Sequence, residues 1–297
     1  MLNFRELTLE DKDWINGILR DCHFMSCEYC FGNHFIWKNA YKEMVARIGN
    51  FYTLMLHDDE GERGTSFLYP AGQGDRKPVI SALLEYCEAE GIPFRLHSVP
   101  EEALPELESM FPGQFEFSNN RDYADYIYSV EDLTNLAGKK YHGKRNHLAR
   151  FRENDWSFEP ITDKNFDDCL RMNREWCRLN DCGRDAGLRE EQCAVRKSFE
   201  YFRELNFFGG LLRVDGRVIA YTLAERLNSD TVVVHMEKAF SDIQGAYVAI
   251  NHEFVANMCQ DYTYVNREED LGVEGLRSAK LSWKPAILLP KYSVRLK

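Results

Sequence analysis

The sequence has 297 residues and a mass of 34.7 kDa, with 44% hydrophobic, 13% aromatic and 29% charged residues. This composition is too apolar for a disordered chain and too charged for a membrane bundle. The formal net charge of −11 disfavours a nonspecific nucleic-acid binder. No spanning segment and no targeting sequence are recognisable, so we expect a cytoplasmic protein, and the length predicts about two domains.

The charge is unevenly divided along the chain. Residues 1–137 hold 11 Lys or Arg and 24 Asp or Glu, whereas residues 138–297 hold 26 and 24. The change falls at residues 138–152, a run with six bases and no acid. Such asymmetry indicates a division of labour, although a solvated helix between two domains would look the same. We predict an N-terminal domain over 1–137, a basic linker helix over 138–152 and a C-terminal domain over 153–297.

In the first half, apolar periodicity and turn residues predict helices followed by strands. The opening stretch to about Ile48 is predicted to be helical, and residues 58–64 a turn between two strands. A helix is expected to begin near Pro78 and to end at Gly91, because these residues suit the two ends of a helix. The remaining elements expected here are strands at 51–57, 65–70, 93–99, 115–117 and 123–130 and a helix at about 100–110.

The second half repeats this order of elements. Asp215-Gly216 predicts a hairpin, because both residues tolerate the positive φ of a tight turn. The β-branched run Thr231–Glu237 predicts a central strand, which leads through Gly245 into a helix. The remaining helices are expected at 163–180, 188–205 and 273–280, and the remaining strands at 210–214, 217–227 and 262–265. A strand or a hairpin is expected at 287–296. A mixed sheet with helices in each half, an α+β (mixed α/β) fold, is therefore expected.

The cysteines give only a weak indication of a metal site. Nine cysteines without a signal peptide predict reduced thiols. Cys22, Cys27 and Cys30 have the spacing of metal ligands, with His23 and His34 close by. A fourth cysteine ligand is not evident nearby, so small buried core residues are the preferred interpretation and no metal site is predicted.

Charged side chains stand where two neighbouring strands of the second half are expected to end. Such strand ends meet at one crevice in an open sheet, where ligands usually bind. Alternation along the strand would put His235 and Glu237 on one face, where either group could take a proton from an attacking amine. A salt-bridge network that includes Glu237, Lys238, Arg267 and Asp270 is the competing interpretation.

Three further places could hold an anion. Gly245 opens a helix whose first N–H groups could bind a phosphate, although a simple tight turn explains the same sequence. Arg277 and Lys280 lie three residues apart on one helix face and could hold a phosphate or a carboxylate. Lys144 and Arg145 could contact phosphates or form a solvated basic face.

Three stretches carry a resemblance to a known family: residues 140–151 with the preceding lysine (KKYHGKRNHLARF), 235–254 (HMEKAFSDIQGAYVAINHEF) and 264–285 (YVNREEDLGVEGLRSAKLSWKP). They resemble the DUF2156 family, which is related to the C-terminal domain of phosphatidylglycerol lysyltransferases. The last stretch is the most specific, because Asn-Arg-Glu-Glu-Asp-x-Gly followed by Gly-Leu-Arg-x-x-Lys is improbable by chance.

The resemblance implies two tandem GNAT-like domains, a fold shared with Fem-type aminoacyltransferases. In that case Glu237 would be the general base or would position the acceptor, and Lys280 and Arg277 would hold a phosphate or the developing oxyanion. Other positions that match the family motifs would bind substrate or phosphate: Lys144, Arg145, Asn146, Lys238, Asn266, Arg267, Glu268 and Asp270. His235 and Gly245, chosen for their places in the sheet and the turn, complete the expected substrate-binding set.

The resemblance also implies a reaction. We expect transfer of an aminoacyl group from aminoacyl-tRNA to an amine or hydroxyl acceptor, a small molecule or a lipid headgroup, with no permanently bound cofactor. The alternatives are an acyl-CoA-dependent N-acyltransferase and a non-enzymatic protein that binds a metabolite on the same fold. The turn Asp242–Tyr247 disfavours acetyl-CoA, because the aspartate repels a pyrophosphate and the tyrosine crowds its approach.

Overall fold

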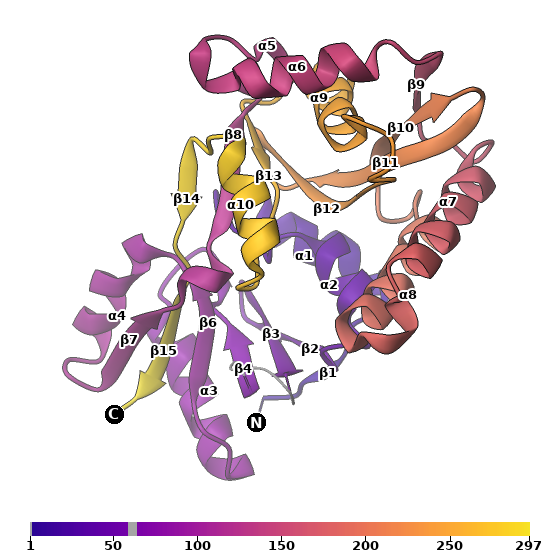
Figure 1. Cartoon of the computed structure of the whole chain (residues 1–297). Coiled ribbons are helices and arrows are strands. Elements are labelled where there is room, and N and C mark those ends of the chain that lie inside the picture. The colour runs from indigo at the N-terminus through magenta and orange to yellow at the C-terminus, as the bar shows by residue number, and fades with distance from the viewer. Residues whose placement is uncertain (1, 59–63) are drawn as a thin grey trace. The chain divides into compact units, whose positions relative to one another are not determined.

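A computed structural model describes residues 2–58 and 64–297, so the predicted turn at 58–64 lies, apart from its two ends, outside the described residues. The chain divides into two compact units (Figure 1). Unit 1 comprises Met1–Asp125, Glu269–Glu274 and Leu288–Lys297, and unit 2 comprises Tyr126–Glu268 and Gly275–Ile287. Each unit holds a mixed sheet with helices, which confirms the predicted α+β (mixed α/β) fold.

Unit 1 is built on a sheet with the strand order β1-β2-β3-β4-β6-β15-β7, with β5 paired to β3. Its strands are β1 (Arg5–Glu6), β2 (Met44–Ile48), β3 (Phe51–Asp58), β4 (Gly64–Leu68), β5 (Ala71–Gly72), β6 (Arg95–Val99), β7 (Phe115–Asn119) and β15 (Tyr292–Leu296). Its helices are η1 (Leu9–Asp11), α1 (Lys12–Leu19), α2 (Phe31–Trp37), α3 (Lys77–Glu90), η2 (Glu101–Ala103), α4 (Leu104–Met110) and η3 (Arg121–Tyr123). As predicted, Gly91 ends α3 in the left-handed conformation, with φ 67°.

Unit 2 is built on a sheet with the strand order β14-β8-β13-β12-β11-β10-β9. Its strands are β8 (Asp125–Ser129), β9 (Trp156–Pro160), β10 (Phe208–Val214), β11 (Arg217–Arg226), β12 (Thr231–Ala239), β13 (Tyr264–Asn266) and β14 (Ile287–Leu289). Its helices are α5 (Val130–Asn135), η4 (Lys139–Tyr141), α6 (His142–Phe151), α7 (Phe166–Leu179), η5 (Cys182–Arg184), α8 (Ala186–Glu200), α9 (Ala246–Met258) and α10 (Glu274–Ser282).

The two sheets repeat one topology, as the order of predicted elements suggested. An antiparallel run (β2-β3-β4 and β10-β11-β12) is followed by one parallel neighbour, β6 in unit 1 and β13 in unit 2. The next strand in each sheet is antiparallel, β15 in unit 1 and β8 in unit 2. Each parallel pair leaves a crossover connection, which α3 and α9 supply.

The division between the units differs from the predicted linear boundaries. The last strand, β15, joins the sheet of unit 1 between β6 and β7, whereas β8 joins the sheet of unit 2. The predicted linker at 138–152 contains α6, which lies inside unit 2 and buries Leu148 and Phe151. Strand pairing between distant segments sets these boundaries, and a linear reading of composition does not detect it.

One predicted element is wrong. Residues 44–48, taken as the end of a helical stretch, form β2, which pairs along its whole length with β3. Val45 and Ala46 are buried there, whereas helix α2 has already ended at Trp37. Pairing with the edge of β3 outweighed the local helical pattern of these residues.

Candidate active site at the ends of β12 and β13

Strands β12 and β13 run together for only three residues. Thr231–Val233 pairs in parallel with Tyr264–Asn266, and β12 then continues to Ala239 after β13 has ended. Asn266 shapes the turn that follows, because its Oδ1 accepts a hydrogen bond of 2.7 Å from the backbone N–H of Glu268. The predicted site residues of both strands therefore stand where the strands separate, which is where open sheets bind ligands.

A β-bulge reorients His235 within β12. Met236 lies opposite Leu223 and Val234 lies opposite Ala224, so His235 is the extra residue between the two pairs. A bulge interrupts strict alternation and turns a side chain in a new direction. The expectation that His235 and Glu237 share one face depended on unbroken alternation, and the structure places the two side chains in separate polar networks.

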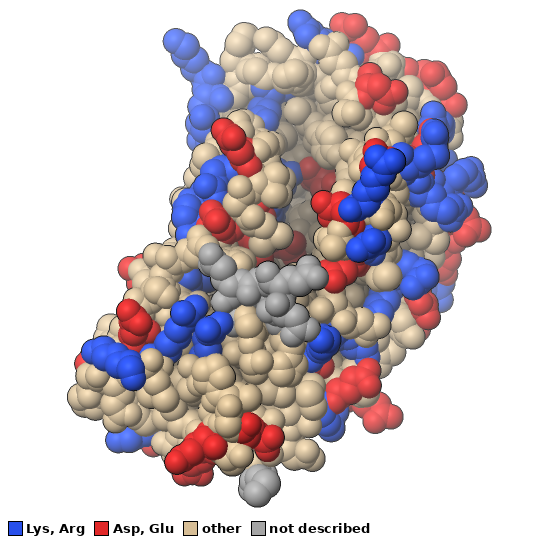
Figure 2. All heavy atoms as spheres, turned by 60° about the horizontal axis from the view of Figure 1, so that its bottom comes forward, with Lys and Arg blue, Asp and Glu red and all other residues tan. Residues whose placement is uncertain are grey.

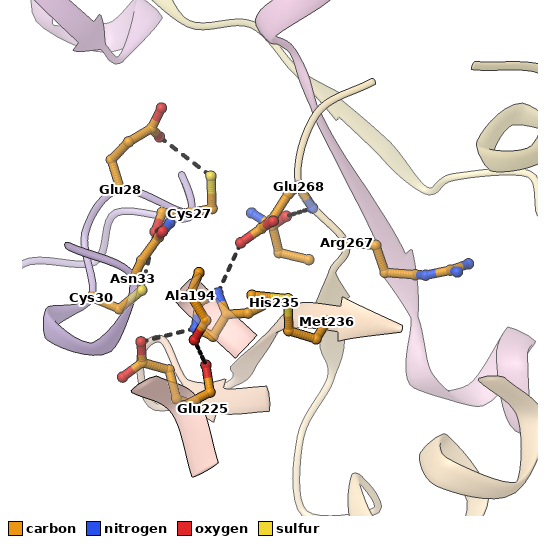
Figure 3. A network of polar contacts seen from close by, with 12 residues as sticks. Cys27, Glu28, Cys30, Asn33, Ala194, Glu225, His235, Met236, Arg267 and Glu268 are labelled. Carbon is orange, nitrogen blue, oxygen red and sulfur yellow. Dashed lines mark hydrogen bonds and ion pairs between the residues drawn. The ribbon is translucent and has the colours of Figure 1, made fainter. Parts of the chain in front are cut away.

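His235 is held between two carboxylates (Figure 3). Its Nδ1 lies 2.8 Å from Glu268 Oε1 and its Nε2 lies 2.9 Å from Glu225 Oε1, and its side chain is 1% exposed. Burial lowers the pKa of the imidazole, but the hydrogen bonds to Glu225 and Glu268 outweigh burial and raise the pKa to about 9. The ring is therefore a buried imidazolium at neutral pH, and it holds the turn after β13 instead of serving as a base.

Glu237 pairs with Arg267 in the second network. Arg267 Nη2 lies 2.6 Å from Glu237 Oε1, and Asn251 of α9 donates a hydrogen bond of 3.3 Å to Glu237 Oε2. The guanidinium also lies over the rings of Tyr128 and Trp283, at 5.6 and 5.8 Å from their centroids. In Figure 3 the side chain of Arg267 points away from His235 and Glu268. The ion pair and the two rings therefore fix the direction of the guanidinium.

Two buried polar atoms in this second network lack a hydrogen-bond partner among the residues that the structure describes. They are Nη1 of Arg267, a donor, and Oδ1 of Asn251, an acceptor. Buried polar groups are nearly always satisfied, and each exception calls for a missing water, ion or ligand. A donor and an acceptor left open around one carboxylate therefore make Glu237, Arg267 and Asn251 a candidate site for a polar ligand.

Lys144 of α6 lies close to this group. Its Nζ donates a hydrogen bond of 2.7 Å to Ser282 Oγ and lies 4.2 Å from the centroid of the Trp283 ring. Burial and the neighbouring charge of Arg267 lower the pKa of the amine to about 8, against the opposing influence of Glu237. Lys144 can therefore exchange a proton near neutral pH, as a lysine in water does not.

The shifted pKa of Lys144 can be measured directly. We expect its acylation by a trace of acetic anhydride to reach half of its maximum rate near pH 8, because only the neutral amine reacts. Peptide mass spectrometry over a pH series gives this profile for Lys144 and, in the same samples, for the other lysines. A profile for Lys144 that matches lysine free in solution would contradict the assignment.

The two basic residues of α10 have different surroundings. Lys280 is 8% exposed, and its Nζ donates hydrogen bonds to the backbone carbonyls of Arg267 and Glu268 at 2.6 and 3.1 Å. Its ammonium therefore fixes the turn after β13 and positions Arg267. Arg277 is half-buried on the same helix. Their predicted roles in holding a phosphate or oxyanion stay predictions.

The predicted salt-bridge network is not a single network. Lys238 pairs with Glu191 of α8 at 2.6 Å and lies 3.8 Å from the ring centroid of Trp176. Asp270 belongs to unit 1, where it is fully buried and pairs with Arg121 at 3.3 Å. Glu237 and Arg267 thus form one ion pair of their own, apart from the pairs made by Lys238 and Asp270.

Arg145 and Asn146 lie on the exposed side of α6. Arg145 Nη1 donates hydrogen bonds to the carbonyls of Leu136 and Gly138, which ties α6 to the end of α5. Asn146 contacts His142 one turn earlier at 3.3 Å. The hydrogen bonds to Leu136 and Gly138 give Arg145 a structural role. A phosphate-binding role for Arg145 or Asn146 stays a prediction.

Gly245 has a packing role. It precedes α9 with φ 83°, and a Cβ atom there would lie 2.3 Å from the backbone oxygen of His147. The glycine therefore allows α6 to pack against the start of α9, which brings Lys144 into unit 2. Whether the first N–H groups of α9 also bind an anion stays a prediction.

Substituting Gly245 by Ala is expected to destabilise the protein by about 1–3 kcal/mol, because a left-handed φ and a backbone clash coincide. Gly143 of α6 is the matched control, since a Cβ there would meet nothing within 4 Å. Gly143→Ala should be neutral or stabilising by up to about 1 kcal/mol. Urea denaturation compares the two variants, and equal stabilities would contradict the packing role.

The three N-terminal cysteines do not gather into a thiolate cluster among the described residues. Cys22, Cys27 and Cys30 are all buried, in keeping with the preferred interpretation. Cys27 Sγ lies among Glu28, Asp125 and the ammonium of Lys291, which is 2.8 Å from Glu28 and 2.9 Å from Asp125. Figure 3 shows the contact between Cys27 and Glu28. The lysine supplies the positive charge that these buried carboxylates require.

Sequence reasoning missed Asn251, Trp283 and Glu225. Asn251 is 1% exposed on the mostly apolar buried face of α9, and a polar residue in such a stripe is a signal that could have been used. Trp283 follows α10 within the motif at 264–285 but carries no charge, so a search for titratable groups passes over it. Glu225 lies in a strand that alternation alone does not connect with His235.

Solved structures share this fold. A conserved protein of unknown function from Bacteroides thetaiotaomicron is 38% identical, with a TM-score of 0.95 and 100% of both chains covered. The C-terminal domain of a candidate lysylphosphatidylglycerol synthetase from Agrobacterium fabrum is 13% identical, with a TM-score of 0.69 over 96% of this chain and 91% of that one. FemX is 9% identical, with a TM-score of 0.63 over 98% and 96%. At the identities of the last two, the likeness shows the fold alone.

The fold of this chain is therefore the one found in FemX and in the lysylphosphatidylglycerol synthetase domain. The family model for the C-terminal part of phosphatidylglycerol lysyltransferase matches residues 20–295, and the chain belongs to this family. An uncharacterised protein of Mycoplasmoides gallisepticum is 21% identical over 184 residues, which are 58% of this chain, and the match spans 56% of that protein's length. None of the helices in the described residues is both long and apolar enough to cross a lipid bilayer.

Proposed function

We propose that this protein is an acyltransferase that transfers an aminoacyl group from aminoacyl-tRNA to an amine or hydroxyl acceptor, with the reaction in unit 2. The observation that carries the proposal is the Glu237–Arg267 pair with its open donor, Nη1 of Arg267. Membership of the lysyltransferase family supports the type of reaction, and the fold shared with FemX supports it further.

The geometry supports a division of roles in acyl transfer. Glu237 accepts a proton from the acceptor amine or hydroxyl as its nitrogen or oxygen bonds to the ester carbon. Nη1 of Arg267 donates to the carbonyl oxygen, where negative charge develops in the transition state. The ester C–O bond then breaks, and the ammonium of Lys144, whose pKa is about 8, gives its proton to the departing oxygen. Lys280 and Asn251 act through Arg267 and Glu237 as positioning residues.

The names of the relatives support the choice of donor and acceptor, which are part of the proposal. A lysylphosphatidylglycerol synthetase, by its name, joins lysine to the headgroup of a lipid. We therefore place an activated aminoacyl ester at Arg267 and a hydroxyl or amine, on a lipid headgroup or a small molecule, at Glu237. No permanently bound cofactor takes part in this scheme.

The test uses the whole chain with a set of tRNAs that carry radiolabelled amino acids. Acceptors are vesicles that contain phosphatidylglycerol and, separately, small amines. We expect one charged tRNA to lose its ester faster than by spontaneous hydrolysis, with the label recovered in the acceptor. Arg267→Lys should slow that loss by about 10²–10³-fold, because its ammonium does not reproduce the fork of donors.

Two results would overturn the proposal. The aminoacyl-tRNA donor is wrong if no charged tRNA is consumed above hydrolysis while millimolar acyl-CoA raises the melting temperature and is turned over. A non-enzymatic role is indicated if a donor or acceptor binds but no donor is consumed, and if the only effect of Arg267→Lys is the loss of that binding.

A further inference from the structure

A cavity lies between α7 and α8, away from the strand ends. Its volume is about 520 Å³, within the range of sites that hold a drug-sized ligand. Residues of α7, η5 and α8 line it, among them Leu170, Arg174, Cys177 and Arg178 of α7 and Val195 and Arg196 of α8. Figure 2 shows Lys and Arg gathered, with acids beside them, on the side where Figure 1 places α7 and α8.

Three arginines face this cavity, and no residue of its lining is acidic. Arg174 and Arg178 stand one turn apart on α7, and Arg196 comes from α8. Within the described chain none of the three makes an ion pair, whereas other arginines of unit 2, such as Arg213, pair with carboxylates. In a protein of net charge −11, three such guanidinium groups around one hollow mark a site for an anion.

Nearby carboxylates are engaged elsewhere. Glu175 pairs with Arg217, and Glu191 pairs with Lys238. Asp185 caps α8 by accepting a hydrogen bond of 2.8 Å from the backbone N–H of Leu188. These three carboxylates therefore have other partners, and none of them pairs with the arginines of the cavity.

The lining also defines what the ligand carries besides its charge. Leu170, Cys177 and Val195 supply apolar surface, and Cys177 and Val195 are buried. Three guanidinium forks offer more donors than the two oxygens of a carboxylate accept, whereas a phosphate monoester presents three terminal oxygens. We infer that this cavity binds a phosphate monoester with an apolar or aromatic body. The inference does not depend on the transfer reaction at Glu237.

Isothermal titration calorimetry with the whole chain tests the site. The probes are inorganic phosphate, adenosine monophosphate and a soluble short-chain phosphatidate, which share the phosphate and differ in the body. We expect one of the two esters to bind at least about tenfold more tightly than inorganic phosphate, because only an ester also covers the apolar lining. Tighter binding of the nucleotide would identify an aromatic body, and tighter binding of the phosphatidate an aliphatic one.

Variants locate the binding. Arg174→Ala and Arg178→Ala, made singly and together, should each weaken binding of the preferred ester by about tenfold or more, since charge-assisted hydrogen bonds are lost. Arg203→Ala is the matched control, because Arg203 is exposed, pairs with Asp163 and lies outside the lining. All three arginines are exposed, so their removal leaves the core intact. The inference would be overturned if the variants of Arg174 and Arg178 bound the esters with the same affinity as the wild-type protein and Arg203→Ala.

Cys193 provides a second readout inside the cavity. It is the exposed cysteine among the nine, so iodoacetamide should modify it first. The preferred ester at saturation should slow this alkylation in the wild-type protein and in Arg203→Ala. No protection in the wild-type protein, or undiminished protection at the same ester concentration in the double variant, would place the ester elsewhere and overturn the inference.

Discussion

Glu237→Gln is expected to lower the turnover number of acyl transfer by about 10²–10⁴-fold, the usual contribution of a general base. The amide keeps the size of the side chain but cannot accept the proton of the attacking group. Asn251 and Arg267 remain in place around it, so the loss reports the chemistry and not the shape of the site. Single-turnover kinetics with charged tRNA measure the effect.

Glu159→Gln is the matched control for this variant. Glu159 also pairs with an arginine, since its Oε1 lies 2.9 Å from Arg213 Nε, but it stands on β9 at the far edge of the sheet. Arg213 keeps a second partner in Asp168. The control should therefore retain turnover. If Glu237→Gln also retains turnover with an unchanged melting temperature, Glu237 is not the base.

His235→Gln is expected to cost about 3–5 kcal/mol of the free energy of unfolding, the largest loss of stability predicted for this protein. The substitution removes a positive charge from between Glu225 and Glu268 and leaves two carboxylates facing each other with little access to water. Urea denaturation at pH 7 measures the loss. A second variant, His252→Gln, removes a half-buried ring that contacts Glu253 and the carbonyl of Thr134, and should cost only about 1 kcal/mol.

The pH dependence of stability tests the same assignment. The pKa of His235 is raised in the folded state, from an ordinary 6.5 to about 9, so the folded state holds the proton more tightly. The stabilisation is complete below about pH 6.5 and is lost as the pH rises through 9, by about 3 kcal/mol in total. The contribution of His235 is the difference in unfolding free energy between the wild-type protein and His235→Gln, and this difference should shrink by that amount between pH 6.5 and 9. The comparison cancels the opposite effect of Lys144, whose lowered pKa makes stability rise with pH in the same range. A difference that stays constant with pH would exclude a raised pKa of His235.

Local signals predicted much of unit 2 correctly. Asp215 and Gly216 adopt φ of 50° and 76°, as the hairpin between β10 and β11 required. The helix predicted within 138–152 is present as α6. Such features depend on the φ preferences and the spacing of residues close together in the chain, and a single sequence contains that information.

The missed features depend on contacts between distant segments. The bulge at His235 arises from how β11 and β12 pair, and no residue within β12 predicts it. Likewise, Arg267 and Glu237 are 30 residues apart and meet because β13 lies beside β12. The family motifs pointed to both residues, but their ion pair and the open Nη1 required coordinates. The sequence alone was enough to name Glu237 and Arg267 as candidate site residues. It was not enough to show that they contact each other.

The position of β15 has a consequence for how the chain is made. A protein emerges from the ribosome from its N-terminus, and domains usually fold in that order. Among the described strands, β15 (residues 292–296) stands between β6 and β7 and joins them. The sheet of unit 1 must therefore wait, with two strand edges open, while all of unit 2 is synthesised. The first unit to be translated is the last to be completed.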